Sequence, residues 1–129
     1  IDALNQAGES ALMMAALKGD MAGLRTLLAR GAKVNQPGWS ALHYAASGTD
    51  ASEAVRLLLE KGADVNAASP NRSTPLMMAA QYGSEDSVKL LLAGGADPKR
   101  RNQRELKASD FARLAGRDKL AASLAKLES

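Results

Sequence analysis

Residues 40–46, Ser-Ala-Leu-His-Tyr-Ala-Ala, open a sequence unit that the chain repeats. The double leucine Leu58-Leu59 and the tail Gly-Ala-Asp-Val-Asn at residues 62–66 complete this unit. Two further copies follow the same order of box, leucines and tail, and a weaker fourth copy has a box at 107–113 followed by Leu120 and Leu124. Self-similarity at a nearly fixed period indicates a stack of similar structural units. The equivalent box positions lie 30, 34 and 33 residues apart, at Leu12, Leu42, Leu76 and Ser109.

Each part of the unit has a local physical reason. Ser10, Ser40 and Thr74 are expected to begin a first helix, because a hydroxyl oxygen there accepts hydrogen bonds from free backbone N–H groups. Pro75 suits the first helical turn, where a missing N–H group removes no hydrogen bond. Leucines at helical spacing then predict a second helix. A glycine follows that second helix in the first three copies, where a left-handed C-cap favours this residue: Gly31, Gly62 and Gly95.

The period near 33 residues and the box resemble the ankyrin repeat. The resemblance covers nearly the whole chain, and its three sequence elements recur in phase. It implies an all-α solenoid of helix–turn–helix units with projecting β-hairpin-like loops. A globular four-helix bundle is the alternative, but a bundle does not require repeating loop sequences.

The period also predicts how one domain over residues 1–129 is divided. We expect residues 1–4 to be the remnant of an upstream repeat. The polar second helix of the last copy predicts a C-terminal cap, because terminal repeats need a wettable face. The expected units are repeat 1 at 5–35, repeat 2 at 36–66, repeat 3 at 67–99 and the capping repeat at 100–129.

Composition narrows the function classes. The 129 residues include no cysteine, which excludes disulfides, cysteine-ligated metals and thiol nucleophiles. A single histidine makes a zinc site unexpected. No glycine-rich phosphate-binding motif occurs, and no apolar run approaches the roughly 20 residues of a membrane helix. We therefore expect no enzyme activity, no cofactor, no metal and no membrane insertion.

His43 is that single histidine. Beside Ser40, Ser47 and Asp50 it could be read as part of a hydrolytic triad. The ankyrin resemblance implies a structural role instead, in which the histidine bonds to backbone and to the box hydroxyl. The structural box predicted in this way consists of Ser10, Ser40, His43, Thr74 and Pro75.

The methionine pairs allow two interpretations. Methionine is adaptable enough to form a binding surface. Core packing between repeats is the preferred prediction for Met14 and Met78, since they align with Tyr44 and Phe111.

Trp39 directly precedes the second box. The resemblance implies that this position varies and points toward the ligand, and an exposed indole would be a strong anchor. Alternatively, Trp39 folds over its hairpin, which is three residues short. Gly31 lies 11 residues before Leu42, whereas Gly62 lies 14 before Leu76. The predicted partner-binding residues are Glu9, Leu17, Lys18, Trp39, Asn71, Arg72, Ser73, Gln81 and Tyr82.

The resemblance implies a protein-binding scaffold or adaptor that uses its hairpin tips and concave inner-helix face. A nucleic-acid contact is an alternative, because residues 99–107 contain five basic residues. That segment has no interleaved aromatic residues for base stacking. A structural spacer within a longer chain is another alternative. The sequence is also similar to short bacterial ankyrin proteins with an export signal, which implies the periplasm, with the cytoplasm as the alternative.

Overall fold

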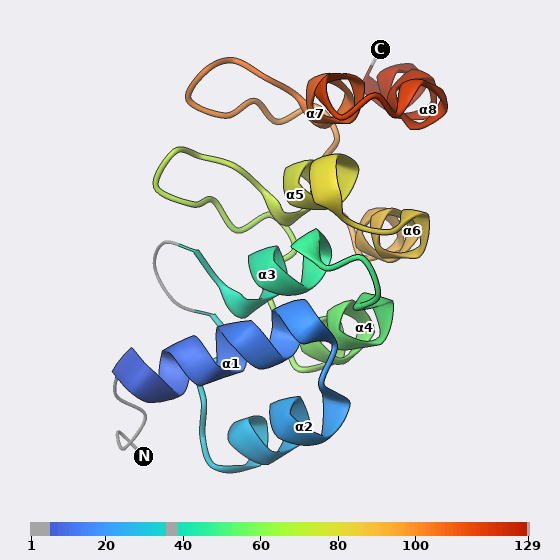
Figure 1. Cartoon of the computed structure of the whole chain (residues 1–129). Coiled ribbons are helices and arrows are strands. Elements are labelled where there is room, and N and C mark those ends of the chain that lie inside the picture. The colour runs from blue at the N-terminus through green and yellow to red at the C-terminus, as the bar shows by residue number, and fades with distance from the viewer. Residues whose placement is uncertain (1–5, 36–38, 129) are drawn as a thin grey trace.

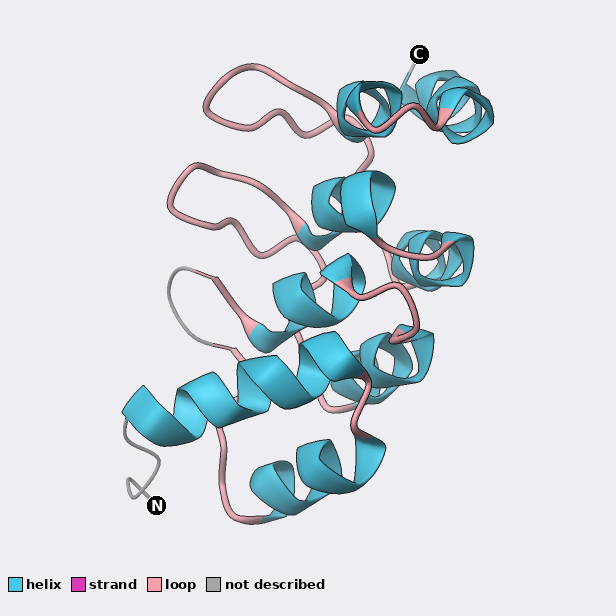
Figure 2. Cartoon of the chain, viewed as in Figure 1, coloured by secondary structure: helices cyan, strands magenta, loops and turns pink. Residues whose placement is uncertain are grey.

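The computed structural model describes residues 6–35 and 39–128, which form a stack of helix pairs (Figure 1). Within these ranges there are no strands, and loops join the helices (Figure 2). The all-α solenoid expected from the sequence is therefore confirmed. The helices are α1 (Gln6–Lys18), α2 (Met21–Ala29), α3 (Ala41–Ser47), α4 (Ser52–Glu60), α5 (Pro75–Tyr82), α6 (Glu85–Ala93), α7 (Ala108–Leu114) and α8 (Asp118–Glu128).

The helices form two layers. Helices α1, α3, α5 and α7 pack successively against one another as the inner layer, and each also packs against the helix that follows it in the chain. The outer layer consists of α2, α4, α6 and α8. The long loops before α5 and α7 project to the same side of the inner layer (Figure 1).

Small residues allow the inner helices to approach closely. The alanine pairs 15–16, 45–46 and 79–80 are buried. At Gly83, which ends α5, an added Cβ atom would collide with the carbonyl oxygen of Ala46 in the preceding repeat. The spacing between repeats thus depends on the absence of a side chain at this position.

The first helix begins earlier than the sequence predicted. Ser10 was expected to precede the helix, but α1 begins at Gln6 and includes Ser10. Gln, Ala and Glu within residues 6–10 have high intrinsic helix propensity, so the helix can extend through this segment. Because Glu9 lies within α1 as well, it does not lie on a projecting hairpin.

The prediction that Met14 packs in the core is wrong. Its side chain is 46% exposed, whereas Met78 is 8% exposed. Helix α1 heads the described stack and packs chiefly against α2 and α3. Met14 lines an open depression between α1 and α2, together with Lys18 and Thr26.

Asparagine side chains explain why the tail of the unit repeats. Asn35 donates to the carbonyl oxygen of Gly62 at 3.0 Å and accepts from the N–H group of Asp64 at 2.7 Å. Asn66 makes the same two bonds to the next copy, at 3.3 and 2.8 Å. Each of these asparagines therefore joins its repeat to the following one. In the third copy Lys99 takes this position.

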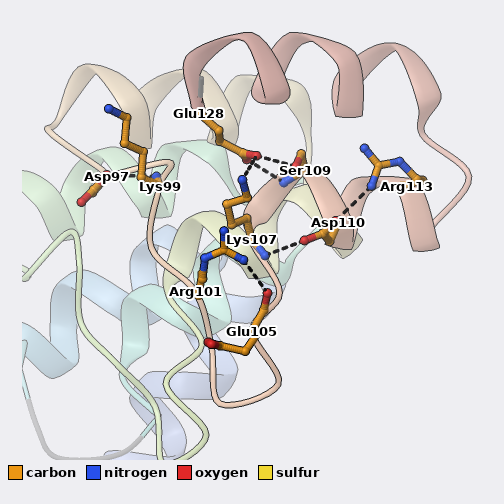
Figure 3. Close-up of polar contacts among 9 residues, drawn as sticks. All are labelled: Asp97, Lys99, Arg101, Glu105, Lys107, Ser109, Asp110, Arg113 and Glu128. Atoms are coloured by element: carbon orange, nitrogen blue, oxygen red, sulfur yellow. Dashed lines mark hydrogen bonds and ion pairs between the residues drawn. The ribbon is translucent and has the colours of Figure 1, made fainter.

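The last helix closes over the start of α7 (Figure 3). The Glu128 side chain is only 3% exposed, and Lys107 Nζ lies 3.7 Å from it. One carboxylate oxygen accepts the Ser109 hydroxyl at 2.6 Å, and the other accepts the Ser109 N–H group at 3.0 Å. These bonds explain why serine replaces the box leucine in the last copy.

Arg117 ties the last helix pair to the preceding one. Its guanidinium donates to the carbonyl oxygens of Ala79 and Ala80, both at 3.0 Å. These carbonyls lie in the last turn of α5, where cationic side chains stabilise a helix. The sequence had indicated only a polar surface here.

Candidate partner-binding groove

A groove of about 410 Å³ lies where the hairpin loops meet the inner helices. It spans three successive units, from Trp39 through α5 to the loop and helix of the last pair. Five of the nine predicted partner-binding residues line it: Trp39, Asn71, Ser73, Gln81 and Tyr82.

Helices α5 and α7 supply the apolar part of the groove. Met78 and Phe111 are buried side chains that line it. Tyr82 and Leu114, which follow them by one helical turn, line it too and are 54% and 69% exposed. Residues separated by three or four positions share one face of a helix. The groove therefore combines an apolar base with two large exposed side chains.

Short polar side chains fix the two hairpins beside the groove. Asn102 is buried, and its side-chain oxygen accepts the N–H groups of Arg104 at 2.9 Å and Leu106 at 3.0 Å. Asn71 similarly accepts the N–H group of Ser73 at 3.2 Å. Its backbone carbonyl also accepts the N–H group of Gln103 at 2.8 Å, which joins the two hairpins. The loops thus form a defined surface without strand pairing.

Two non-glycine residues occupy the left-handed region at equivalent hairpin positions. Arg72 and Glu105 both have a φ angle of 64°. Each lies four residues before the box position of its copy. This conformation is unfavourable for residues with a Cβ atom and is commonly retained at functional sites.

Trp39 forms one wall of the groove. Its ring meets the His43 ring edge-on, with centroids 5.2 Å apart and planes at 75°. The indole is partly buried against the core, so its exposed part is held in place. The same side chain thus packs against the core and lines the groove. Residues 36–38 of the shortened hairpin lie outside the described part of the chain.

His43 orders the second box. Its Nδ1 atom accepts the Ser40 hydroxyl at 2.9 Å and the Ser40 N–H group at 3.1 Å, while Nε2 donates to the Ser73 carbonyl oxygen at 2.8 Å. This pattern assigns the neutral tautomer with its proton on Nε2. Burial lowers the pKa of His43 and outweighs the opposing effects of backbone hydrogen bonds and of Asp64.

The same geometry disfavours the hydrolytic triad. Ser40 and His43 are 2% and 1% exposed, so a substrate has no access to the hydroxyl. Ser47 directs its hydroxyl to the carbonyl oxygen of His43 at 2.8 Å, not to the imidazole ring. In the third box, Thr74 and Pro75 lie at the start of α5, where the Thr74 hydroxyl accepts the N–H group of Met77 at 3.3 Å.

The remaining predicted partner residues lie elsewhere. Leu17 and Lys18 end α1 and do not line this groove. Arg72 is exposed at the hairpin tip beside it. The side chain of Glu9 lies outside the described part of the structure.

Sequence reasoning missed the contribution of the last copy to the groove. Leu114 occupies the position of Gln81, five residues after the box position, so alignment of the copies would have selected it. Arg104 was instead grouped with the basic segment. The lining residues that were missed are Met78, Asn102, Arg104, Leu106, Phe111 and Leu114.

Three of the five cations in residues 99–107 have intramolecular partners. Arg100 lies 3.8 Å from Asp97, and Lys107 pairs with Glu128. Arg101 donates to the backbone carbonyl of Glu105 at 3.2 Å (Figure 3). Arg104 is the one charged residue among the groove-lining residues.

Within residues 6–35 and 39–128, no group of three or more His, Cys, Asp or Glu side chains could hold a metal ion. In the same ranges, no helix has both the length and the apolar character needed to cross a bilayer.

The repeated helix pairs with their projecting loops define a class of helical repeat proteins. The family model of ankyrin repeats (3 copies) matches residues 12–102. The chain therefore belongs to the ankyrin repeat family. Ankyrin repeats generally mediate protein–protein interaction, and the repeat domain itself is a non-catalytic interaction module.

Several proteins contain a region that is similar in sequence to this chain. The chain is 39% identical over 102 residues to the mouse nuclear factor NF-kappa-B p105 subunit, covering 76% of this chain and 10% of that protein. It is 42% identical over 94 residues to human neurogenic locus notch homolog protein 4, covering 70% and 5%. The Drosophila melanogaster tyrosine-protein kinase Shark is 37% identical over 119 residues, covering 89% and 13%. In each comparison the similarity covers a small part of the relative.

Proposed function

We propose that this chain is a protein-binding module that holds its partner in the groove formed by the hairpins and inner helices. One observation carries the proposal. Residues from three successive units converge on one groove whose edge includes the exposed side chains of Tyr82 and Leu114. Tyrosine is among the residues that commonly contribute most of the binding energy of an interface.

The experiment is affinity capture from a lysate of the source organism, read by mass spectrometry. Wild type is compared with the double variant Tyr82→Ala/Leu114→Ala. Because both side chains are exposed, the variant should keep the fold, which circular dichroism checks. Leu127→Ala on α8 is the matched control, since Leu127 is 48% exposed and does not line the groove.

We expect proteins that wild type and Leu127→Ala both enrich to be lost with the double variant. Truncation of a residue that dominates an interface weakens binding by about 2 kcal/mol or more. The same enriched proteins with all three chains would contradict the proposal. The absence of any enriched protein would also count against it and would favour the structural spacer.

The basic segment supports a nucleic-acid contact less well. Its internal ion pairs and hydrogen bonds occupy three of its five cations, and phosphate binding depends on cations that are available for contact. Binding to DNA or RNA that falls steeply as salt is raised would favour this alternative.

Two finer assignments rest on the sequence pattern. We propose that residues 100–129 form the C-terminal cap, with repeats 1 to 3 at 5–35, 36–66 and 67–99. We also propose, from the resemblance to short bacterial ankyrin proteins, that this protein acts in a bacterial periplasm. Cell fractionation of the source organism tests that location.

A further inference from the structure

The charge of the groove narrows the chemistry of its partner. Arg104 lines the groove, and none of the other lining residues is acidic or basic. Among the described residues, no hydrogen bond or ion pair engages the Arg104 guanidinium. By contrast, Arg100, Arg101 and Lys107 in the same segment all have intramolecular partners.

Backbone contacts hold Arg104 beside the groove. Its N–H group is bonded to the buried Asn102 side chain at 2.9 Å. The next hairpin bond runs from the Glu105 N–H group to the Asn102 carbonyl oxygen at 2.9 Å. Glu105 is exposed and does not line the groove. Hydrogen bonds therefore hold the backbone from which the Arg104 side chain extends.

The apolar part of the groove lies close to this cation in the fold. Met78 and Phe111 form its buried base, and Leu114 and Tyr82 extend beside them. An apolar side chain of a partner can be buried there. A planar guanidinium is suited to a carboxylate, with which it forms paired, charge-assisted hydrogen bonds.

We infer that the groove recognises an extended protein segment in which an apolar side chain packs between Tyr82 and Leu114 and a neighbouring carboxylate pairs with Arg104. This inference rests on the proposed function and specifies the class of partner. The groove crosses three units, so its length suits an extended segment. Opposite charge at the hairpin side sets the orientation of that segment.

The test uses a random peptide library displayed on phage, selected on wild type and on Arg104→Glu. Arg56→Glu is the matched control. It makes the same charge change at an exposed residue of α4 that does not line the groove. Selected peptides are then synthesised and titrated against each chain. Trp39 is the single tryptophan and lines the groove, so its fluorescence reports binding there.

We expect wild type to select peptides with Asp or Glu close to Leu, Ile or Phe. These peptides should bind Arg104→Glu about tenfold more weakly, because a charge-assisted bond is replaced by repulsion at a partly solvated site. Arg56→Glu should bind them as wild type does. The selection on Arg104→Glu should favour Lys or Arg instead.

Peptides without a carboxylate, or peptides that bind Arg104→Glu as tightly as wild type, would overturn the inference. If such peptides still depend on Tyr82 and Leu114, the proposed binding function survives and only the partner chemistry fails. If no peptide is enriched, or if none depends on these two residues, the inference and the groove assignment both fail.

Discussion

At the residue scale, His43 couples two repeats through a buried polar network. It accepts from Ser40 at the start of its own helix and donates to Ser73 in the next hairpin. Protonation would place a hydrogen on Nδ1, which must accept both Ser40 bonds. The neutral form is therefore required by geometry as well as by burial. The hydrogen bond from His43 to Ser73 joins the second repeat to the third. The third copy has Met77 at the equivalent position, and a methionine side chain cannot donate such a bond.

This network predicts a pH-dependent stability. Because burial lowers the pKa of His43 below its usual value of 6.5, the unfolded chain takes up a proton first as the pH falls. The stability contributed by the neutral ring is therefore present above pH 6.5 and is lost as the pH falls through 6.5 toward the lower folded-state pKa. The loss for this one group should not exceed about 1.4 kcal/mol per pH unit.

Urea unfolding measured on either side of this window checks the prediction. Wild type should lose more stability on acidification than His43→Gln, which is less stable at neutral pH but has no titrating group here. Equal pH dependence in the two chains would show that other groups control acid sensitivity.

At the element scale, the close approach of successive inner helices depends on the residue that ends each one. Gly83 follows α5 and abuts the Ala46 carbonyl oxygen, so Gly83→Ala must displace backbone. We expect a loss of about 3 kcal/mol in the free energy of unfolding, as for overpacked cores.

Gly62→Ala is the matched control. Its φ is 92° but an added Cβ atom meets nothing within 4 Å, so only the local strain of about 1 kcal/mol should appear. Equal losses in the two variants, measured by urea unfolding, would contradict this account of repeat spacing.

The sequence predicted the helix pairs of the inner repeats better than the two ends of the described stack. Helix-ending glycines and alanine pairs obey local rules, so their pattern is sufficient to predict the helix pairs. Met14 and Ser10 were mispredicted because they belong to the first helix of the described stack, where the pattern of the inner repeats does not hold. Groove residues from the hairpin and helix of repeat 3 were predicted from the resemblance. Leu114 and Arg104 were missed because they lie in the least regular copy.

At the scale of the whole molecule, stability is distributed along the stack. Each repeat contacts only its neighbours, so the junctions determine whether the array unfolds as one unit. Asn35 and Asn66 supply side-chain bonds across two junctions. Each of these bonds joins two segments that belong to different repeats. The sequence of one repeat alone therefore does not predict them. At the last junction, Arg117 supplies the comparable bonds to α5.

Arg117→Ala should therefore uncouple the last helix pair from the rest of the stack. Removing two charge-assisted bonds to backbone carbonyls should weaken this junction by about 2 kcal/mol.

Trp39 reports the middle of the stack through its fluorescence, whereas far-ultraviolet circular dichroism reports all helices. The two probes should give coincident urea transitions for wild type, as expected for two-state unfolding. For Arg117→Ala, loss of helical signal should begin before the Trp39 signal changes. Arg113→Ala is the control, because the Arg113 side chain is exposed and, among the described residues, bonds only to Asp110 in its own helix at 2.9 Å. Coincident transitions in Arg117→Ala, or separated transitions in Arg113→Ala, would show that Arg117 does not maintain the cooperativity of the stack.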